Sequence, residues 1–245
     1  MEQKIRVGAV SYLNTKPLVY GFEKGLMKDE IELIFDYPAR IAAMLLNNEI
    51  DVGLIPVAVM PKLAEPHIIS DYCIGASQAV ASVCLFSDVP LAEIKEILVD
   101  YQSRTSAALL KMLLKKYWKI DPVLTDSSDG YQQNIKGTTA GLVIGDRALE
   151  QRHHSAYIFD LAEAWQQMTN LPFVFAAWVA NKKLPDDFKI AFNSATGLGL
   201  QHIEEIVSRV NFEAYDMKAY YTKNIDYRLD EKKKEGLGLF LSYLR

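Results

Sequence analysis

Short apolar runs alternate with amphipathic segments over the first quarter of the chain. Three of the runs, 4–10, 31–37 and 51–57, are compact enough to be buried strands. The segments between them, 17–26 and 39–48, have helical spacing, and a proline begins or precedes each. This alternation predicts a parallel sheet with right-handed crossovers. Such sheets bind ligands beyond the carboxyl ends of their strands.

The same alternation begins again in the middle of the chain. A short apolar run at 96–100 is followed by a helical pattern at 103–118, and another run follows at 141–146. These elements predict a second α/β lobe.

Two further apolar runs, 82–87 and 173–180, bracket the middle region and are candidates for segments that cross between the lobes. The first lobe is then discontinuous, built from residues 1–85 and 180–245. Residues 86–179 form the inserted second lobe, and a ligand cleft is expected between the two.

The C-terminal part of the chain shows no further strand pattern. It predicts helices at 187–200, 201–210 and 230–245, packed on the first lobe. The basic run Lys232 to Lys234 lies among acidic residues and is expected to form a solvated helix face.

Composition narrows the classes of function. Half of the 245 residues are apolar, which is enough for a sizeable core, and 27 Lys and Arg are balanced by 31 Asp and Glu. Nucleic-acid binding is not expected, because it needs a clustered basic face. The first apolar run is too short for a membrane span or a signal peptide, so we expect a cytoplasmic protein without a membrane partner.

No metal site is expected. Cys73 and Cys84 lie in apolar, strand-like segments, where buried and reduced thiols are the ordinary state. The adjacent His153 and His154 lack the spaced partners of a zinc site and are expected in a solvated loop.

The strongest local signal is SYLNTKPL at 11–18. It places Ser11, Asn14 and Thr15 between a buried strand and the start of a helix, where backbone N–H groups favour anions. Helix capping by one of these side chains explains the same pattern, and spacing does not separate the two interpretations.

A second signal surrounds the next expected helix start, in DYQSRTSAALL. Ser103, Thr105 and Ser106 supply hydroxyl groups, and Arg104 supplies a fixed positive charge. One hydroxyl suffices for a cap, so this cluster favours a carboxylate-binding site.

Two weaker signals complete the set. Ser82 and the small residues Gly75 and Ser77 are candidates for a cleft wall, although small residues in strands also serve packing. Gly145 and Asp146 end a strand, where Asp146 is equally explained as a helix N-cap. The motifs GxSxG, HExxH, the P-loop and the dinucleotide glycine fingerprint are not found in the sequence.

Taken together, SYLNTKPL, DVGLIPVAV, SVCLFS, DYQSRTSAALL and GDRAL resemble the menaquinone-biosynthesis family of the futalosine pathway, over most of the chain. Within it, SYLNTKPL resembles the chorismate dehydratase branch. The sister branch, 1,4-dihydroxy-6-naphthoate synthase, usually opens with a different serine- and proline-rich motif. The resemblance implies a type II periplasmic-binding-protein-like fold, in agreement with the two lobes predicted above.

The resemblance also implies the activity and part of the site. A hydro-lyase of this branch converts chorismate to 3-[(1-carboxyvinyl)oxy]benzoate and water without a metal or organic cofactor. The family's active-site asparagine matches Asn14, and a pocket serine matches Ser82. Two alternatives stay open, namely the sister synthase and a non-catalytic cytoplasmic solute-binding protein, because fold alone does not decide function.

Overall fold

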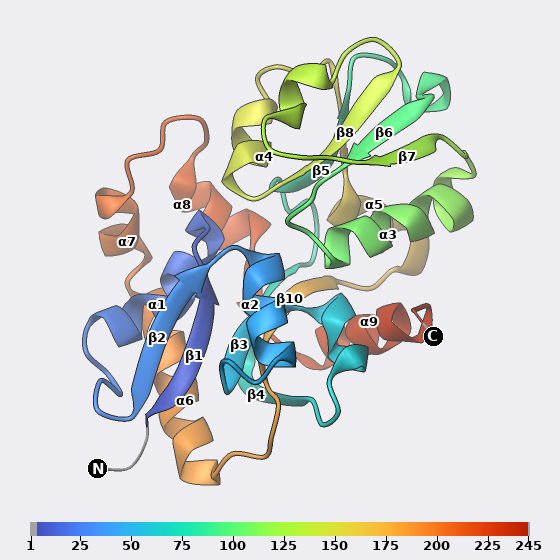
Figure 1. The fold of residues 1–245 in the computed structure, drawn as a ribbon. Helices are drawn as coiled ribbons and strands as arrows, with labels where there is room; N and C mark the ends of the chain where they lie inside the picture. The colour runs from blue at the N-terminus through green and yellow to red at the C-terminus, as the bar shows by residue number, and fades with distance from the viewer. Residues whose placement is uncertain (1–3, 245) are drawn as a thin grey trace.

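The computed structural model describes residues 4–244 as two α/β lobes, each built around its own sheet (Figure 1). The first sheet has six strands in the order β11-β4-β10-β3-β1-β2, and the second has five in the order β7-β6-β8-β5-β9. Residues 1–3 of the expected first lobe and residue 245 of the expected last helix lie outside the described residues.

The strands of the first sheet are β1 (Ile5–Val10), β2 (Ile31–Asp36), β3 (Val52–Pro56), β4 (His67–Ala76), β10 (Phe173–Ala180) and β11 (Asp226–Arg228). Those of the second are β5 (Val83–Ser87), β6 (Glu96–Val99), β7 (Val123–Asp126), β8 (Thr139–Ile144) and β9 (Tyr157–Asp160). The α-helices are α1 (Lys16–Glu23), α2 (Pro38–Leu46), α3 (Thr105–Leu113), α4 (Asp146–Gln151), α5 (Leu161–Thr169), α6 (Asp186–Leu198), α7 (Ile203–Arg209), α8 (Met217–Ala219) and α9 (Glu231–Ser242). Two further helical turns matter below, η2 (Val57–Lys62) and η7 (Tyr220–Asn224).

The first sheet is mixed, whereas the sequence predicted a parallel one. The early strands do pair in parallel, β1 with β2 and β1 with β3. Strand β10, however, is antiparallel to both β3 and β4. It enters this sheet directly from the second lobe, and among the described residues no crossover helix on the sheet's face joins it to a neighbouring strand. The rule that crossover helices connect parallel strands therefore does not fix its direction.

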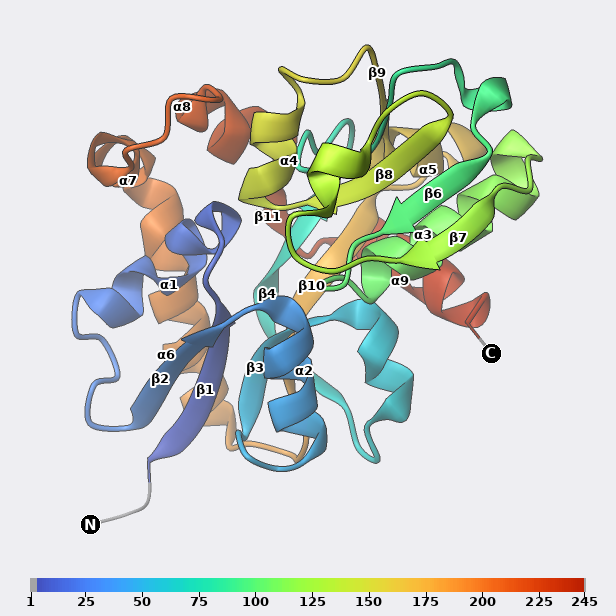
Figure 2. The same ribbon diagram turned by 45° about the horizontal axis from the view of Figure 1, so that its top comes forward.

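The two apolar runs expected to cross between the lobes each lie within one sheet. Strand β5 pairs with β8 and β9 in the second sheet, and β10 pairs with β3 and β4 in the first. The expected boundary at 85 therefore cuts through β5, and the one at 180 separates β10 from its own sheet. The chain crosses instead in the segments just before these strands, as Figure 2 shows for β10.

The C-terminal segment contains a strand that the sequence did not predict. Strand β11 spans three residues, too few for a period-2 pattern, and pairs with β4. The expectation of a wholly solvated basic helix face was also wrong. Lys233 is fully buried and forms ion pairs with Asp226 at 2.6 Å and Asp230 at 3.3 Å, while Lys232 and Lys234 are exposed.

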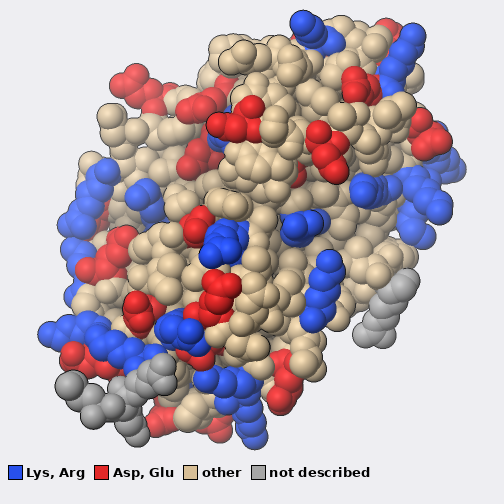
Figure 3. Space-filling model, viewed as in Figure 1, with Lys and Arg blue, Asp and Glu red and all other residues tan. Residues whose placement is uncertain are grey.

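The expectations for the two cysteines and the two adjacent histidines are confirmed. Cys73 and Cys84 are buried and unpaired, and His153 and His154 are exposed in the turn after α4. On the face drawn in Figure 3, basic and acidic side chains are interspersed. Between residues 4 and 244, no helix is long and apolar enough to cross a membrane, and no group of three or more His, Cys, Asp or Glu is placed to hold a metal ion.

Candidate active site

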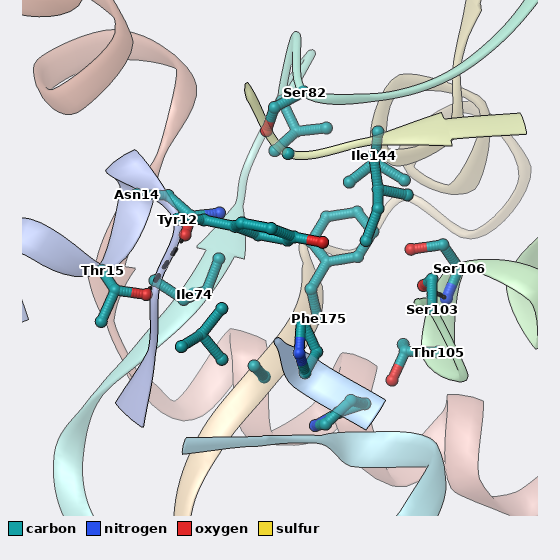
Figure 4. A pocket seen from close by; sticks show the side chains of 17 residues that line it. Tyr12, Asn14, Thr15, Ile74, Ser82, Ser103, Thr105, Ser106, Ile144 and Phe175 are labelled. Carbon is teal, nitrogen blue, oxygen red and sulfur yellow. Dashed lines mark hydrogen bonds between the residues drawn. The ribbon is translucent and has the colours of Figure 1, made fainter. Parts of the chain in front are cut away.

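A cavity lies between the lobes, where the carboxyl ends of β1 and β3 face the start of α3 and the end of β8 (Figure 4). It holds about 530 Å³ of free space, part of it open to solvent. Apolar walls come from Val10, Ile74, Val83, Ile144 and Phe175, among others. The polar side chains that line it are Tyr12, Asn14, Thr15, Ser82, Ser103, Thr105 and Ser106.

The cavity brings together most of the site residues predicted from the sequence. The predicted residues that line it are Asn14, Thr15, Ser82, Ser103, Thr105, Ser106 and Gly145. The other five predicted residues do not line it: Ser11, Ser77 and Arg104 are exposed, Asp146 is partly buried, and Gly75 is buried. The charge that Arg104 was expected to supply is therefore absent from the described lining.

Residues 12–15, called the first turn below, lie between β1 and α1, and no side chain among the described residues caps α1. Thr15 stands at the N-cap of α1 without a capping hydrogen bond, and its Oγ1 donates to Asn14 Oδ1 at 3.3 Å (Figure 4). The backbone oxygen of Asn14 accepts a hydrogen bond from Tyr227 Oη at 2.9 Å. The amide nitrogen of Asn14 carries two N–H donors, and Oδ1 keeps a second lone pair, so this side chain can contact a ligand.

Ser82 lies in a strained turn just before β5. The residue before it, Ala81, has a φ of +65°, a conformation that costs a non-glycine residue about 1–3 kcal/mol. Surrounding groups hold this turn: Asp160 Oδ2 accepts from Ala81 N at 2.7 Å, and Arg152 donates to Ala81 O at 3.2 Å. Backbone strain maintained in this way is typical of functional sites.

On the opposite wall, the hydroxyl groups at the start of α3 have separate tasks. Ser103 Oγ accepts from the backbone N–H of Ser106 at 3.1 Å, so it caps the helix start. Thr105 Oγ1 accepts from the backbone N–H of Ala58 in η2 at 3.1 Å, which links the two lobes. Each hydroxyl that accepts a bond still has its own hydrogen to donate, so this wall can bind an anion.

Asp146 also bridges the lobes, and its interpretation as an N-cap was wrong. Its carboxylate accepts the backbone N–H of Leu13 at 3.1 and 3.3 Å, and α4 has no side-chain cap. Burial raises the pKa of Asp146 to about 6, although the hydrogen bond from Leu13 acts in the opposite direction. The carboxyl group therefore titrates within the range in which many enzymes work.

The sequence did not single out Tyr12, whose ring lies across the middle of the cavity (Figure 4). Its hydroxyl group bonds to Gln102 of the second lobe, and Arg147 donates to the same Gln102 oxygen at 3.2 Å. Gly145, with a φ of +64°, lies against the ring, and a Cβ there would be 2.9 Å from it. These partners are distant in sequence, so no local pattern could have revealed them.

The lining is notable for the side chains that it lacks. Among the described residues that face the cavity, there is no Asp, Glu, His, Lys or Arg. The phenol of Tyr12 stays protonated near neutral pH because burial raises its pKa. The cavity thus offers hydrogen-bond donors and apolar walls, but no side chain suited to general-base catalysis at neutral pH.

Comparisons with known proteins agree with this architecture. A protein family described as "Menaquinone biosynthesis" matches residues 5–245. A chorismate dehydratase of Thermus thermophilus is 25% identical over 262 residues, which cover 97% of this chain and 94% of that protein.

Solved structures show the same fold. A structural-genomics protein of Archaeoglobus fulgidus has a TM-score of 0.77 at 15% identity, over 98% of this chain and 96% of that one. The periplasmic aliphatic sulphonate-binding protein of Escherichia coli has a TM-score of 0.60 at 14% identity, over 99% and 88%. The chain therefore has the type II periplasmic-binding-protein-like fold that the sequence predicted.

Proposed function

Because the chain belongs to the menaquinone biosynthesis family, we propose that it is a chorismate dehydratase, a hydro-lyase that acts in the cytoplasm on the futalosine pathway. The relative from Thermus thermophilus, which is named for this activity and matches over nearly the full length of both chains, supports the proposal. The observation that carries it is the cavity itself, whose lining, within residues 4–244, combines hydrogen-bond donors with no Asp, Glu, His, Lys or Arg side chain. Such a site suits a reaction in which the substrate supplies its own base.

The proposed reaction balances without a cofactor. The C3–H and C4–O bonds of chorismate break, and a C3–C4 double bond completes an aromatic ring. The enolpyruvyl carboxylate of the substrate takes the C3 proton and delivers it to the departing hydroxyl group, which leaves as water. The products are 3-[(1-carboxyvinyl)oxy]benzoate and water.

The protein's task is then to orient the substrate and exclude water. Asn14 and Ser82 bind the reacting end, where their hydrogen bonds hold the departing hydroxyl group and fix the carboxylate. Ser103, Thr105 and Ser106 donate hydrogen bonds to the ring carboxylate at the opposite wall. Apolar side chains such as Phe175 and Ile144 pack on the ring.

The test is to incubate the purified protein with chorismate, without added cofactor, and follow the products by mass spectrometry and ultraviolet absorbance. The expected result is loss of one water with appearance of an aromatic product. Chorismate that binds but stays unchanged would indicate a solute-binding protein. Turnover of the cyclic futalosine derivative instead of chorismate would indicate the sister synthase.

A further inference from the structure

Tyr220 lies directly behind Ser82, although 138 residues separate them in the chain. It begins η7, in the C-terminal segment that returns to the first lobe, and its side chain is fully buried. Its Oη donates a hydrogen bond to Ser82 Oγ at 2.7 Å. Tyr220 does not line the cavity, so any effect on a ligand must pass through Ser82.

This hydrogen bond determines the direction in which Ser82 can donate. A serine hydroxyl has one hydrogen, and its oxygen accepts hydrogen bonds from other groups. Because Ser82 Oγ accepts from Tyr220, its own hydrogen must point away from the phenol. Among residues 4–244, Ser82 Oγ donates to no other group, so the open direction for its hydrogen is the cavity that Ser82 lines.

The phenol of Tyr220 is suited to remain a donor. Burial raises the pKa of Tyr220 well above its usual range. It therefore stays protonated at any pH at which the enzyme would be assayed. The direction of the Ser82 hydroxyl group does not depend on pH.

The same C-terminal segment supports both residues of the reacting end. Tyr227 donates to the backbone oxygen of Asn14, and Asn224 donates to the backbone oxygen of Ala79 at 3.0 Å, three residues before Ser82. The residue next to Tyr220 provides a contrast. Tyr221 is also buried, yet its hydroxyl group has no hydrogen-bond partner among residues 4–244.

We propose that Tyr220 is a positioning residue that directs the hydrogen of the Ser82 hydroxyl group toward the departing hydroxyl group of the substrate. The inference rests on the proposed function and deepens it. Chorismate would then meet a serine already arranged as a donor, and no reorientation would be needed during the reaction.

The test compares Tyr220→Phe with Tyr221→Phe, two substitutions that each remove one buried hydroxyl group from neighbouring positions. We expect Tyr220→Phe to lower kcat for chorismate about 10- to 100-fold and to change KM less than about 3-fold. Tyr221→Phe should leave both constants within about 2-fold of wild type, because no hydrogen bond is lost. Equal kcat values for the two variants would overturn the proposal.

A double-mutant cycle with Ser82→Ala shows whether Tyr220 acts through Ser82. Once Ser82 has lost its hydroxyl group, Tyr220→Phe should lower kcat by less than about 2-fold. If the loss from Tyr220→Phe is as large in Ser82→Ala as in the wild type, Tyr220 has a general structural role and the proposal fails.

One readout does not depend on the proposed function. The Raman doublet of a tyrosine reports whether its phenol donates or accepts a hydrogen bond, and the difference between wild type and Tyr220→Phe isolates the doublet of Tyr220. A donor signature that is lost in Ser82→Ala supports the inference even if chorismate is not turned over. An acceptor signature in the wild type would overturn it, whereas failure of the chorismate assay alone would overturn only the proposed function.

Discussion

The first turn and the start of α3 form opposite walls of the cavity, and different contacts hold them in place. Both combine hydroxyl-bearing residues with a helix start, as the sequence predicted. At α3, Ser103 supports its own helix start by accepting from the backbone N–H of Ser106, and one distant contact, from Ala58 N–H to Thr105, adds to it. In the first turn the helix has no side-chain cap, and the contacts come from Asp146, Gly145 and Tyr227, far along the chain.

This difference separates two tasks. A local cap makes a wall that forms with its helix and suits the binding of one end of a substrate. A turn that distant residues hold in place reaches its active conformation only when the whole chain is folded and the two lobes are in contact. We therefore expect substitutions in the first turn to lower kcat, and substitutions at the start of α3 to act mainly on KM and stability.

The largest effect is expected for Asn14→Ala. Removal of a donor at the reacting end should lower kcat about 100- to 1000-fold and change KM little, because its hydrogen bond strengthens in the transition state. Steady-state kinetics with chorismate measure both constants. Ser11→Ala is the matched control: Ser11 is exposed outside the cavity, so its loss should not change turnover. A correctly folded Asn14→Ala variant with wild-type kcat would remove Asn14 from the mechanism.

Gly145→Ala should weaken the contact between the first turn and the second lobe. Its φ of +64° disfavours alanine, and the new Cβ would lie 2.9 Å from the Tyr12 ring. We expect a loss of about 2–3 kcal/mol in the free energy of unfolding and a decrease in kcat/KM of about 10-fold or more. Urea denaturation measures the free energy of unfolding, and steady-state kinetics with chorismate measure kcat/KM.

Gly137→Ala separates the two causes of that loss. Gly137 also has a positive φ, of +56°, but no atom lies within 4 Å of the place its Cβ would take. It should therefore lose about 1 kcal/mol of stability through backbone strain and keep wild-type kcat/KM. Similar kinetics for the two variants would mean that the packing of Tyr12 on Gly145 has no part in activity.

The burial of Asp146 should make the stability of the fold depend on pH. The pKa of Asp146 is about 6 in the folded protein and 3.8 when unperturbed, so the folded state binds more protons between these values. The contribution of Asp146 to the free energy of unfolding is therefore complete below pH 4 and is lost as the pH rises through 6. Nearby Glu150 raises this pKa, whereas Lys16 and Arg147 lower it.

Asp146→Asn isolates this contribution, since asparagine keeps an oxygen for Leu13 and does not titrate. Between pH 4 and 7, the free energy of unfolding of the wild type should fall by about 1–2 kcal/mol relative to the variant, after allowance for partial exposure. Parallel urea denaturation series measure the difference. A difference that stays constant with pH would show that Asp146 has an ordinary pKa.

The sequence revealed the elements of the site better than their arrangement. Helical and strand patterns placed Asn14 at the end of β1, and the family resemblance pointed to Asn14 and Ser82, because both signals lie in contiguous residues. Arg104, in contrast, was expected at the site from its position beside three hydroxyl-bearing residues, yet it is exposed. Spacing places a residue at a helix start but does not determine which way a long side chain points.

The contacts that the sequence could not reveal join residues far apart. Tyr12 meets Gln102 and Gly145, Asp146 meets Leu13, and Tyr220 meets Ser82. Each depends on how the lobes pack and on the return of the C-terminal segment. The capping explanation failed at Asp146 for this reason and held at Ser103, where both partners lie within one turn.

The smallest effect is expected for Ser103→Ala, which tests the local wall. Loss of the cap to Ser106 should lower the free energy of unfolding by about 1 kcal/mol, and loss of a donor should raise KM a few-fold while kcat stays near wild type. Ser103→Thr keeps a hydroxyl group and should restore most of the stability and most of the substrate affinity. Thermal denaturation measures the stability of the two variants, and steady-state kinetics measure their KM and kcat. A decrease in kcat as large as that of Asn14→Ala would show that both walls take part in the reaction itself.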